Sequence, residues 1–138
     1  LQLSGAGFPE AVNTAVDAFR NRTGLEITVK NALIGVELSS SDQIHFIQIL
    51  REALANVEKH ARATKVEVCI ERAPDGACTM QVVDNGVGIP EHAEKENHFG
   101  LSIMRERAAA LGAVLSISRR PEGGTIVFMS RPPQKSAL

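Results

Sequence analysis

The chain has 138 residues and a formal net charge of -1, with 43% hydrophobic and 22% charged residues. This length and composition predict one globular domain with a buried core, and they exclude a basic nucleic-acid-binding surface, a membrane-spanning run of apolar residues and a disulfide framework. The two cysteines, Cys69 and Cys78, have no metal-ligand spacing and predict free thiols in a reducing compartment.

The first half of the chain alternates helical and extended patterns. Residues 8–23 predict a helix, with Pro9 near its start and Gly24 as its stop. Residues 25–30 alternate as a strand does, and residues 33–38 predict a second, weaker strand. SSSD at 39–42 offers N-caps for a long helix, whose apolar stripe consists of Ile47, Leu50, Leu54, Val57 and Ala61.

The second half predicts a β-hairpin, a glycine-rich break, a helix and a second pair of strands. The strands are expected at 66–70, 80–84, 114–118 and 125–130, and the helix at 99–112. Together the elements predict an α/β fold, a two-layer sandwich in which one sheet is covered by helices on one face. We expect a single domain over 1–138, with an ordered core of about 8–131 and a frayed tail at 132–138.

Asp84 is the strongest single candidate for ligand binding. The alternation of the strand places it on the same face as Met80 and Val82, so it predicts a carboxylate at the mouth of an apolar layer. Gly86 and Gly88 follow without side chains, which leaves a slot for a flat base that carries a hydrogen-bond donor. The alternative is a plain aspartate–glycine turn at the end of a strand, and this short motif alone favours the turn.

Asn56 is an unusual residue for the middle of a helix, because its side chain competes for backbone hydrogen bonds. Glu52 and Asn56 share one helix face, and Lys59 and His60 lie one turn further. Oxygen ligands with a nearby lysine suit hydrated Mg²⁺ and a phosphate chain. The alternatives are a solvated polar stripe, and a histidine that interacts with the negative end of the helix dipole.

Two further signals are weak when taken alone. Gly100 lies at the start of a helix, where free N–H groups bind anions, and the polar segment 91–98 before it predicts a mobile lid. Thr125 follows two glycines at the start of the last strand. The alternatives are a loop that enters an amphipathic helix and an ordinary hairpin turn.

Four stretches in this order resemble the sequence boxes of one superfamily. REALANVEKHARA (51–63) resembles its N box, DNGVGIP (84–90) its G1 box, HFGLSIMRERA (98–108) its G2 box and EGGTIVF (122–128) its closing glycine–threonine motif. These are the boxes of the GHKL ATPases, which include gyrase, Hsp90, MutL and histidine kinases. Residues 98–113 resemble the nitrate/nitrite-sensor (NarX/NarQ-like) histidine kinases in particular, and the resemblance covers about residues 8 to 131.

The resemblance implies a Bergerat-type sandwich, a mixed sheet with three helices on one face, and roles for individual residues. Asn56 matches a Mg²⁺ ligand, with the acidic Glu52 beside it near the transferred phosphate. Asp84 matches the aspartate that accepts from the adenine amino group. The other implied ATP-binding residues are Lys59, His60, Gly86, Gly88, Gly100, Leu101 and Thr125, and Lys59 joins Glu52 and Asn56 in the catalytic set.

The function implied is the catalytic ATP-binding domain of a bacterial sensor histidine kinase, which uses Mg-ATP to phosphorylate a histidine. The expected partners are a dimerisation domain that carries this histidine, and a response regulator; nucleic acid is not expected. The chain has no histidine in the expected His-Asp pattern, so we expect a cytoplasmic, monomeric fragment of a homodimeric inner-membrane protein. The segment between Asp84 and Gly100 is short for the family.

Two alternatives to this function stay open. One is a free-standing serine kinase of the anti-sigma type, which has the same fold and a similar length. The other is a nucleotide-binding module that holds ATP and transfers nothing. The absence of a starting methionine and the wording of the G2 box disfavour the first, and the intact set of Glu52, Asn56 and Lys59 disfavours the second.

Overall fold

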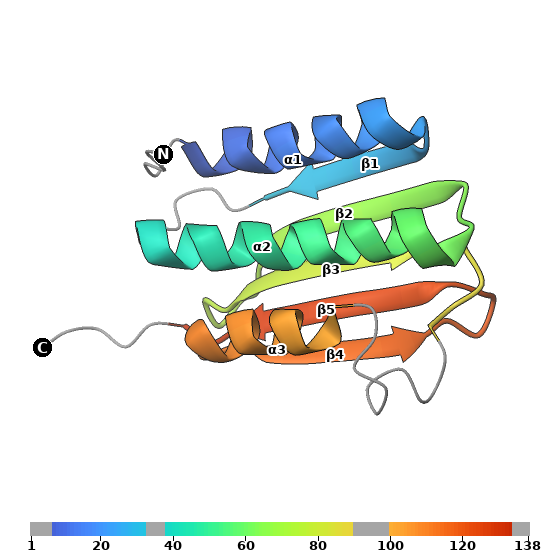
Figure 1. The fold of residues 1–138 in the computed structure, drawn as a ribbon. Helices are drawn as coiled ribbons and strands as arrows, with labels where there is room; N and C mark the ends of the chain where they lie inside the picture. The colour runs from blue at the N-terminus through green and yellow to red at the C-terminus, as the bar shows by residue number, and fades with distance from the viewer. Residues whose placement is uncertain (1–6, 33–37, 90–99, 134–138) are drawn as a thin grey trace, which may run out of the picture.

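A computed structural model describes residues 7–32, 38–89 and 100–133. Three helices lie side by side over one face of a five-stranded sheet (Figure 1). This arrangement confirms the predicted two-layer α/β sandwich. The elements are α1 (Gly7–Thr23), β1 (Glu26–Asn31), α2 (Ser40–Asn56), the π-helical turn η1 (Val57–Ala61), β2 (Lys65–Arg72), β3 (Cys78–Asp84), α3 (Leu101–Ala110), β4 (Val114–Arg119) and β5 (Thr125–Arg131).

The sheet is mixed, with the strand order β1-β2-β3-β5-β4. Only β1 and β2 run parallel; the pairs β2–β3, β3–β5 and β4–β5 are antiparallel. Strand β3 is therefore central, and every second residue from Cys78 to Asp84 is buried. The alternation predicted for this strand is confirmed, and it directs Asp84 toward the helix layer.

The core lies between the sheet and the helices. Because the chain has no Trp or Tyr, aliphatic residues fill most of it, and the Phe8 and Phe46 rings meet edge-to-face at 5.8 Å between centroids. The predicted stripe of the long helix is confirmed for four of its members, which are all buried: Ile47, Leu50, Leu54 and Val57. Both cysteines are free thiols, as predicted, with Cys78 in the core and Cys69 half-buried.

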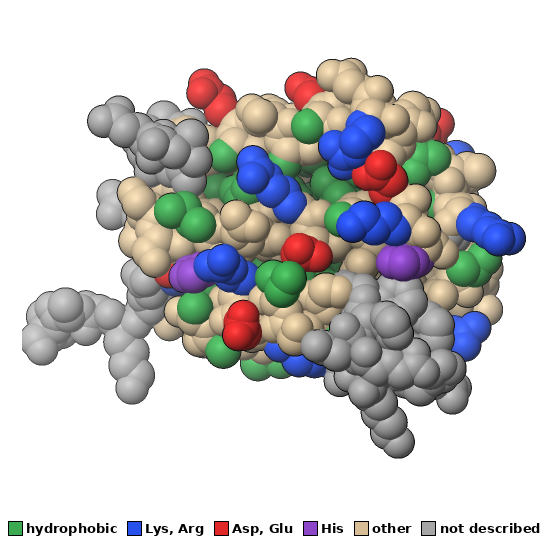
Figure 2. Space-filling view, in the orientation of Figure 1, with side chains coloured by type: hydrophobic (Ala, Val, Ile, Leu, Met, Phe, Trp, Pro, Cys, Tyr) green, Lys and Arg blue, Asp and Glu red, His purple; other side chains and the backbone are tan. Residues whose placement is uncertain are grey.

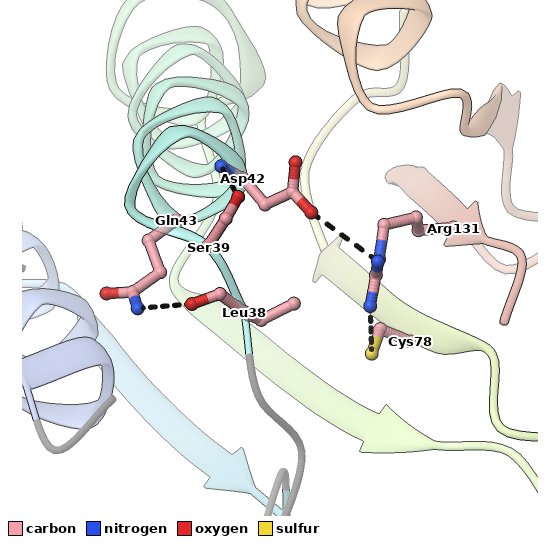
Figure 3. A network of polar contacts seen from close by, with 6 residues as sticks. All are labelled: Leu38, Ser39, Asp42, Gln43, Cys78 and Arg131. Atoms are coloured by element: carbon pink, nitrogen blue, oxygen red, sulfur yellow. Dashed lines mark hydrogen bonds and ion pairs between the residues drawn. The ribbon is translucent and has the colours of Figure 1, made fainter. Parts of the chain in front are cut away.

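The N-terminus of α2 is capped and tied to the sheet. Ser39 is the N-cap, and its hydroxyl accepts from the Asp42 N–H at 3.0 Å. Asp42 also receives the buried Arg131 guanidinium at 3.4 Å, and the same guanidinium donates to the Cys78 sulfur at 3.3 Å (Figure 3). One arginine therefore joins the start of α2 to β3 and β5.

Some expectations lie outside the described residues. These are most of the weak strand at 33–38, the lid segment 91–98, and most of the tail at 132–138. The boundaries of the single domain also stay a prediction. On the helix face, Figure 2 shows basic, acidic and hydrophobic side chains interspersed.

Candidate functional site

A cavity of about 200 Å³ opens between the C-terminal half of α2, η1, α3 and the sheet. Its walls are mostly apolar and its polar groups are few, which is the usual composition of a small-molecule site. The lining residues are Ala53, Asn56, Val57, His60, Val82, Asp84, Val87, Gly88, Ile89, Met104, Ile117, Thr125 and Val127.

The apolar walls come from elements that are distant in the sequence. Val82 and Val127 are buried in the neighbouring strands β3 and β5, and Met104 is buried in α3 opposite them. Sequence reasoning missed Met104 and Ile117 as wall residues, because their burial periodicity is the same as that of any core residue. Such walls bind a flat aromatic ring through dispersion and the hydrophobic effect, without fixing which ring it is.

Asp84 supplies the buried carboxylate of this cavity. It is only 4% exposed and lies at the last position of β3. Its Oδ1 accepts the main-chain N–H of Gly86 at 2.8 Å, and the carboxylate also accepts the main-chain N–H of Thr125. These two donors satisfy part of the carboxylate, and a ligand donor in the cavity would satisfy more of it.

Burial raises the pKa of Asp84 above its ordinary value, because desolvation disfavours the charged form. The two main-chain donors from Gly86 and Thr125, and the positive charge of Arg120, act in the opposite direction and lower the pKa. Burial therefore favours the neutral form of the Asp84 carboxyl, whereas its hydrogen-bond donors and Arg120 favour the charged form.

The loop after Asp84 is anchored to the start of β2. The side-chain Oδ1 of Asn85 accepts the main-chain N–H groups of Thr64 at 2.9 Å and Lys65 at 3.0 Å. The side-chain Nδ2 of Asn85 donates to the Thr64 hydroxyl at 2.9 Å. Gly86 and Gly88 follow, and Gly88 lines the cavity whereas Gly86 acts through its N–H on Asp84. A cavity lies beside Asp84 and Gly88, and its binding of a flat base stays a prediction.

The end of the long helix departs from regular α-helix geometry. Residues 57–61 form a π-helical turn that ends at Arg62 in the left-handed region, φ 52°. Such turns add a residue to the helical repeat, so they rotate the following side chains away from their α-helical positions. Asn56 and His60 line the cavity, whereas Lys59 is exposed and does not.

Glu52 and Gly100 meet outside the lining of the cavity. Gly100 is the N-cap of α3 with φ 63°, and a Cβ there would collide with the Glu52 carboxylate. Glu52 thus lies at the start of α3, where a negative charge favours the helix dipole. Leu101 is buried in the core at 3% exposure and also does not line the cavity. The binding and catalytic roles of these three residues, like those of the other predicted site residues, stay predictions.

The comparisons with known proteins agree with this geometry. A family model, the histidine kinase-, DNA gyrase B- and HSP90-like ATPases, matches residues 41–136. The chain belongs to this ATPase family. The matched residues include all four sequence boxes described above.

Individual relatives are sensor kinases. The chain is 42% identical to the nitrate/nitrite sensor protein NarQ of Escherichia coli over 94% of its own length, and 35% identical to NarX of the same species over 99%. It spans about a quarter of the length of each, 23%. The histidine kinase domain of a blue-light activated kinase from Erythrobacter litoralis superposes with a TM-score of 0.77 at 25% identity, covering 91% of this chain and 60% of that one.

The position of Asp84 in this ATPase domain depends on close packing by the β4–β5 turn. Gly123 and Gly124 have φ of 105° and 102°, a backbone conformation that strains any residue with a side chain, so a substitution causes similar backbone strain at both positions. A Cβ at Gly124 would collide with the main-chain carbonyl of Asp84, whereas a Cβ at Gly123 would lie 3.3 Å from the Gly86 carbonyl.

We expect Gly124→Ala to lower the free energy of unfolding by about 2 kcal/mol more than Gly123→Ala, because the new Cβ overlaps the Asp84 carbonyl in the first variant and is only slightly too close to the Gly86 carbonyl in the second. Urea denaturation of both variants measures the difference. Gly123→Ala is the control for the backbone strain together with a mild close contact. Equal losses for the two variants would show that the contact with Asp84 is not tight.

Proposed function

We propose that this chain is the catalytic ATP-binding domain of a two-component sensor histidine kinase. The observation that carries the proposal is the Asp84 carboxylate, buried at the base of an apolar slot in a chain of the ATPase family. Adenine combines a flat apolar ring with an exocyclic amino donor, which is the chemistry that this slot complements. The names of the sensor kinases among its relatives support the same proposal.

The reaction is phosphoryl transfer from ATP to a histidine on a separate dimerisation domain. An imidazole nitrogen attacks the γ-phosphorus, the bond to the β–γ bridging oxygen breaks, and ADP leaves. The protein supplies positioning and charge neutralisation rather than covalent chemistry. The phosphoryl group then passes to an aspartate of a response regulator.

Magnesium fits the oxygen ligands of Asn56, which lines the cavity, and Glu52, one helical turn earlier. Among the described residues no cluster of three or more His, Cys, Asp or Glu side chains forms a metal cage. Mg²⁺ needs none, since it retains water and shares phosphate oxygens with one or two protein ligands. The Asn56 amide oxygen, with Glu52 one turn earlier, provides hard oxygen ligands of this kind. When bound, the ion neutralises phosphate charge.

The remaining proposals concern the whole protein. We infer a homodimer that forms through the dimerisation domain, in a kinase located in the bacterial inner membrane, with this domain on the cytoplasmic side and monomeric by itself. The helices in residues 7–32, 38–89 and 100–133 include none with the length and apolarity of a membrane span.

The phosphotransfer itself is tested with radiolabelled ATP. We expect the domain alone to bind ATP without acquiring label, and an added dimerisation domain from the same kinase to become labelled, because only that domain carries the acceptor. The label should be lost in acid, since phosphohistidine is acid-labile. Acid-stable label on this chain would instead indicate a serine kinase, and ATP binding without any transfer would indicate a binding module.

Base selectivity tests the role of Asp84. Guanine has a carbonyl oxygen where adenine has the amino group, so two acceptors would face each other. A hydrogen bond to a charged group is worth roughly 1.5–3 kcal/mol, and an unpaired buried group costs a similar amount; we therefore expect ATP to bind on the order of a hundredfold more tightly than GTP. Competition against a fluorescent ATP analogue measures both affinities.

Asp84→Asn should weaken ATP binding at least about tenfold and reduce the preference over GTP, because its amide presents either an oxygen or an NH₂ group. Asp75→Asn is the matched control: Asp75 also accepts a main-chain N–H, from Ala77 at 2.9 Å, but in the β2–β3 turn. Unchanged ATP affinity in Asp84→Asn would mean that Asp84 only closes a turn.

Removal of magnesium tests Asn56. We expect Asn56→Ala to weaken ATP binding on the order of tenfold in Mg²⁺ and to change it little in EDTA, because the lost amide oxygen acts through the ion. Isothermal titration in the two buffers gives the comparison, and Asn21→Ala, on the exposed face of α1, is the control. An equal loss in both buffers would rule out a metal role for Asn56.

A further inference from the structure

Arg120 contacts Asp84 from the β4–β5 turn, 36 residues away in the sequence. Its Nη1 donates to the main-chain carbonyl of Asp84 at 2.9 Å, and its Nε donates to Glu122 at 2.9 Å. The Arg120 side chain is 24% exposed, so it is largely packed, and it does not line the cavity. Arg120 therefore contacts the main chain of Asp84 and not the cavity.

The Arg120 hydrogen bond to the Asp84 carbonyl lies just beyond the end of the β3–β5 pairing. The register of β3 and β5 ends with Val83 opposite Ile126, so Asp84 is the first residue beyond the last pair. The backbone of Gly124 packs against the carbonyl of Asp84 on the same side. Asp84 still lies opposite Val66 of β2, but on the β5 side it has no register partner, and the guanidinium supplies a donor to its carbonyl.

The charge of Arg120 also affects Asp84, because it favours the charged form of the carboxylate. Burial raises the pKa of Asp84, and the nearby guanidinium is one of the groups that lowers it. The exposed Glu122 holds the arginine in this orientation, with a side chain that is itself 64% exposed. Its contribution to stability is small because the pair is solvated.

We propose that Arg120 is a positioning residue for base specificity, which holds the Asp84 main chain so that the carboxylate points at the exocyclic amino group of adenine. The proposal rests on the proposed function, since it needs ATP in the slot. A fixed direction matters because hydrogen bonds weaken steeply when donor and acceptor are misaligned. The rest of the base is held by apolar walls that Arg120 does not touch.

The test compares ATP with purine riboside triphosphate, which lacks only the amino group. The ratio of their dissociation constants isolates the contact to Asp84. We expect Arg120→Gln to reduce this ratio on the order of tenfold, which is the size of one charge-assisted hydrogen bond, while the affinity for purine riboside triphosphate changes little. Arg120→Lys should recover most of the ratio, because an ammonium group can donate to the same carbonyl.

Arg105→Gln is the matched control, since Arg105 also donates to a main-chain carbonyl, that of Leu115 at 3.3 Å, away from Asp84. We expect it to leave the ratio unchanged. Thermal unfolding without nucleotide shows whether each variant is folded. If Arg120→Gln does not fold, the two nucleotides are compared with Arg120→Lys instead.

Two results would overturn the proposal in distinguishable ways. If Arg120→Gln or Arg120→Lys weakens both nucleotides equally, Arg120 is a structural residue and the proposed function stands. If the wild type binds neither nucleotide, or binds both with the same affinity, the base-recognition role of Asp84 fails and the inference fails with it.

Discussion

The cost of burying one carboxylate governs the architecture of the site. A carboxylate at 4% exposure is stable only with hydrogen-bond donors, and three separate segments provide for Asp84. Its own loop contributes the Gly86 N–H and the start of β5 contributes the Thr125 N–H, both to the carboxylate. The β4–β5 turn contributes Arg120, whose positive charge lies nearby and whose Nη1 donates to the main-chain carbonyl of Asp84. The two main-chain donors belong to backbone that is fixed by the fold, and Asp84 lines the cavity, so the remaining acceptor capacity of the carboxylate is available to a ligand there.

The strand order makes this convergence possible. Because β5 pairs with β3, the turn that precedes β5 arrives beside the end of β3, although the two segments are about forty residues apart. The helices complete the cavity from the other side, and α2 is held at both of its ends. Arg131 ties its first turn to the sheet, and the π-turn ends it beside the cavity. The position of Asn56 relative to Asp84 thus follows from the whole layer.

Much of this could be predicted from periodicity alone. Alternation along residues 78–84 is enough to put Asp84 under the helices, and the spacing from Ile47 to Val57 is enough to define the buried face of α2. The fold class follows from the same patterns. These signals are local, and they depend on burial that regular strands and helices express every second, third or fourth residue.

What could not be predicted depends on irregular or distant geometry. A continued α-helix would place both Lys59 and His60 about one turn from Asn56, but in the π-turn the rotation differs, and only His60 of the two lines the cavity. The Arg120 contact depends on a tertiary pairing that no window of sequence contains. In the stretch RRPEGG the arginine looks like any charged turn residue, and its only local signal is Glu122 two positions later.

Two of the helices that line the cavity have termini of opposite sign near it: η1 is the end of the long helix, and α3 begins at Leu101. The C-terminal end of the long helix, at η1, carries partial negative charge, which disfavours a polyphosphate, and the N-terminus of α3 carries partial positive charge. Yet the start of α3 is already approached by the Glu52 carboxylate, which contacts the position of Gly100. A triphosphate in the proposed orientation would therefore meet a carboxylate and a helix C-terminus together. A divalent cation bound by the phosphates would replace this repulsion by attraction, because Asn56 and Glu52 would then face a positive ion. On this argument the adenine of the proposed ATP ligand would be bound by the buried half of the site alone, whereas its phosphates would be bound there only as a magnesium complex.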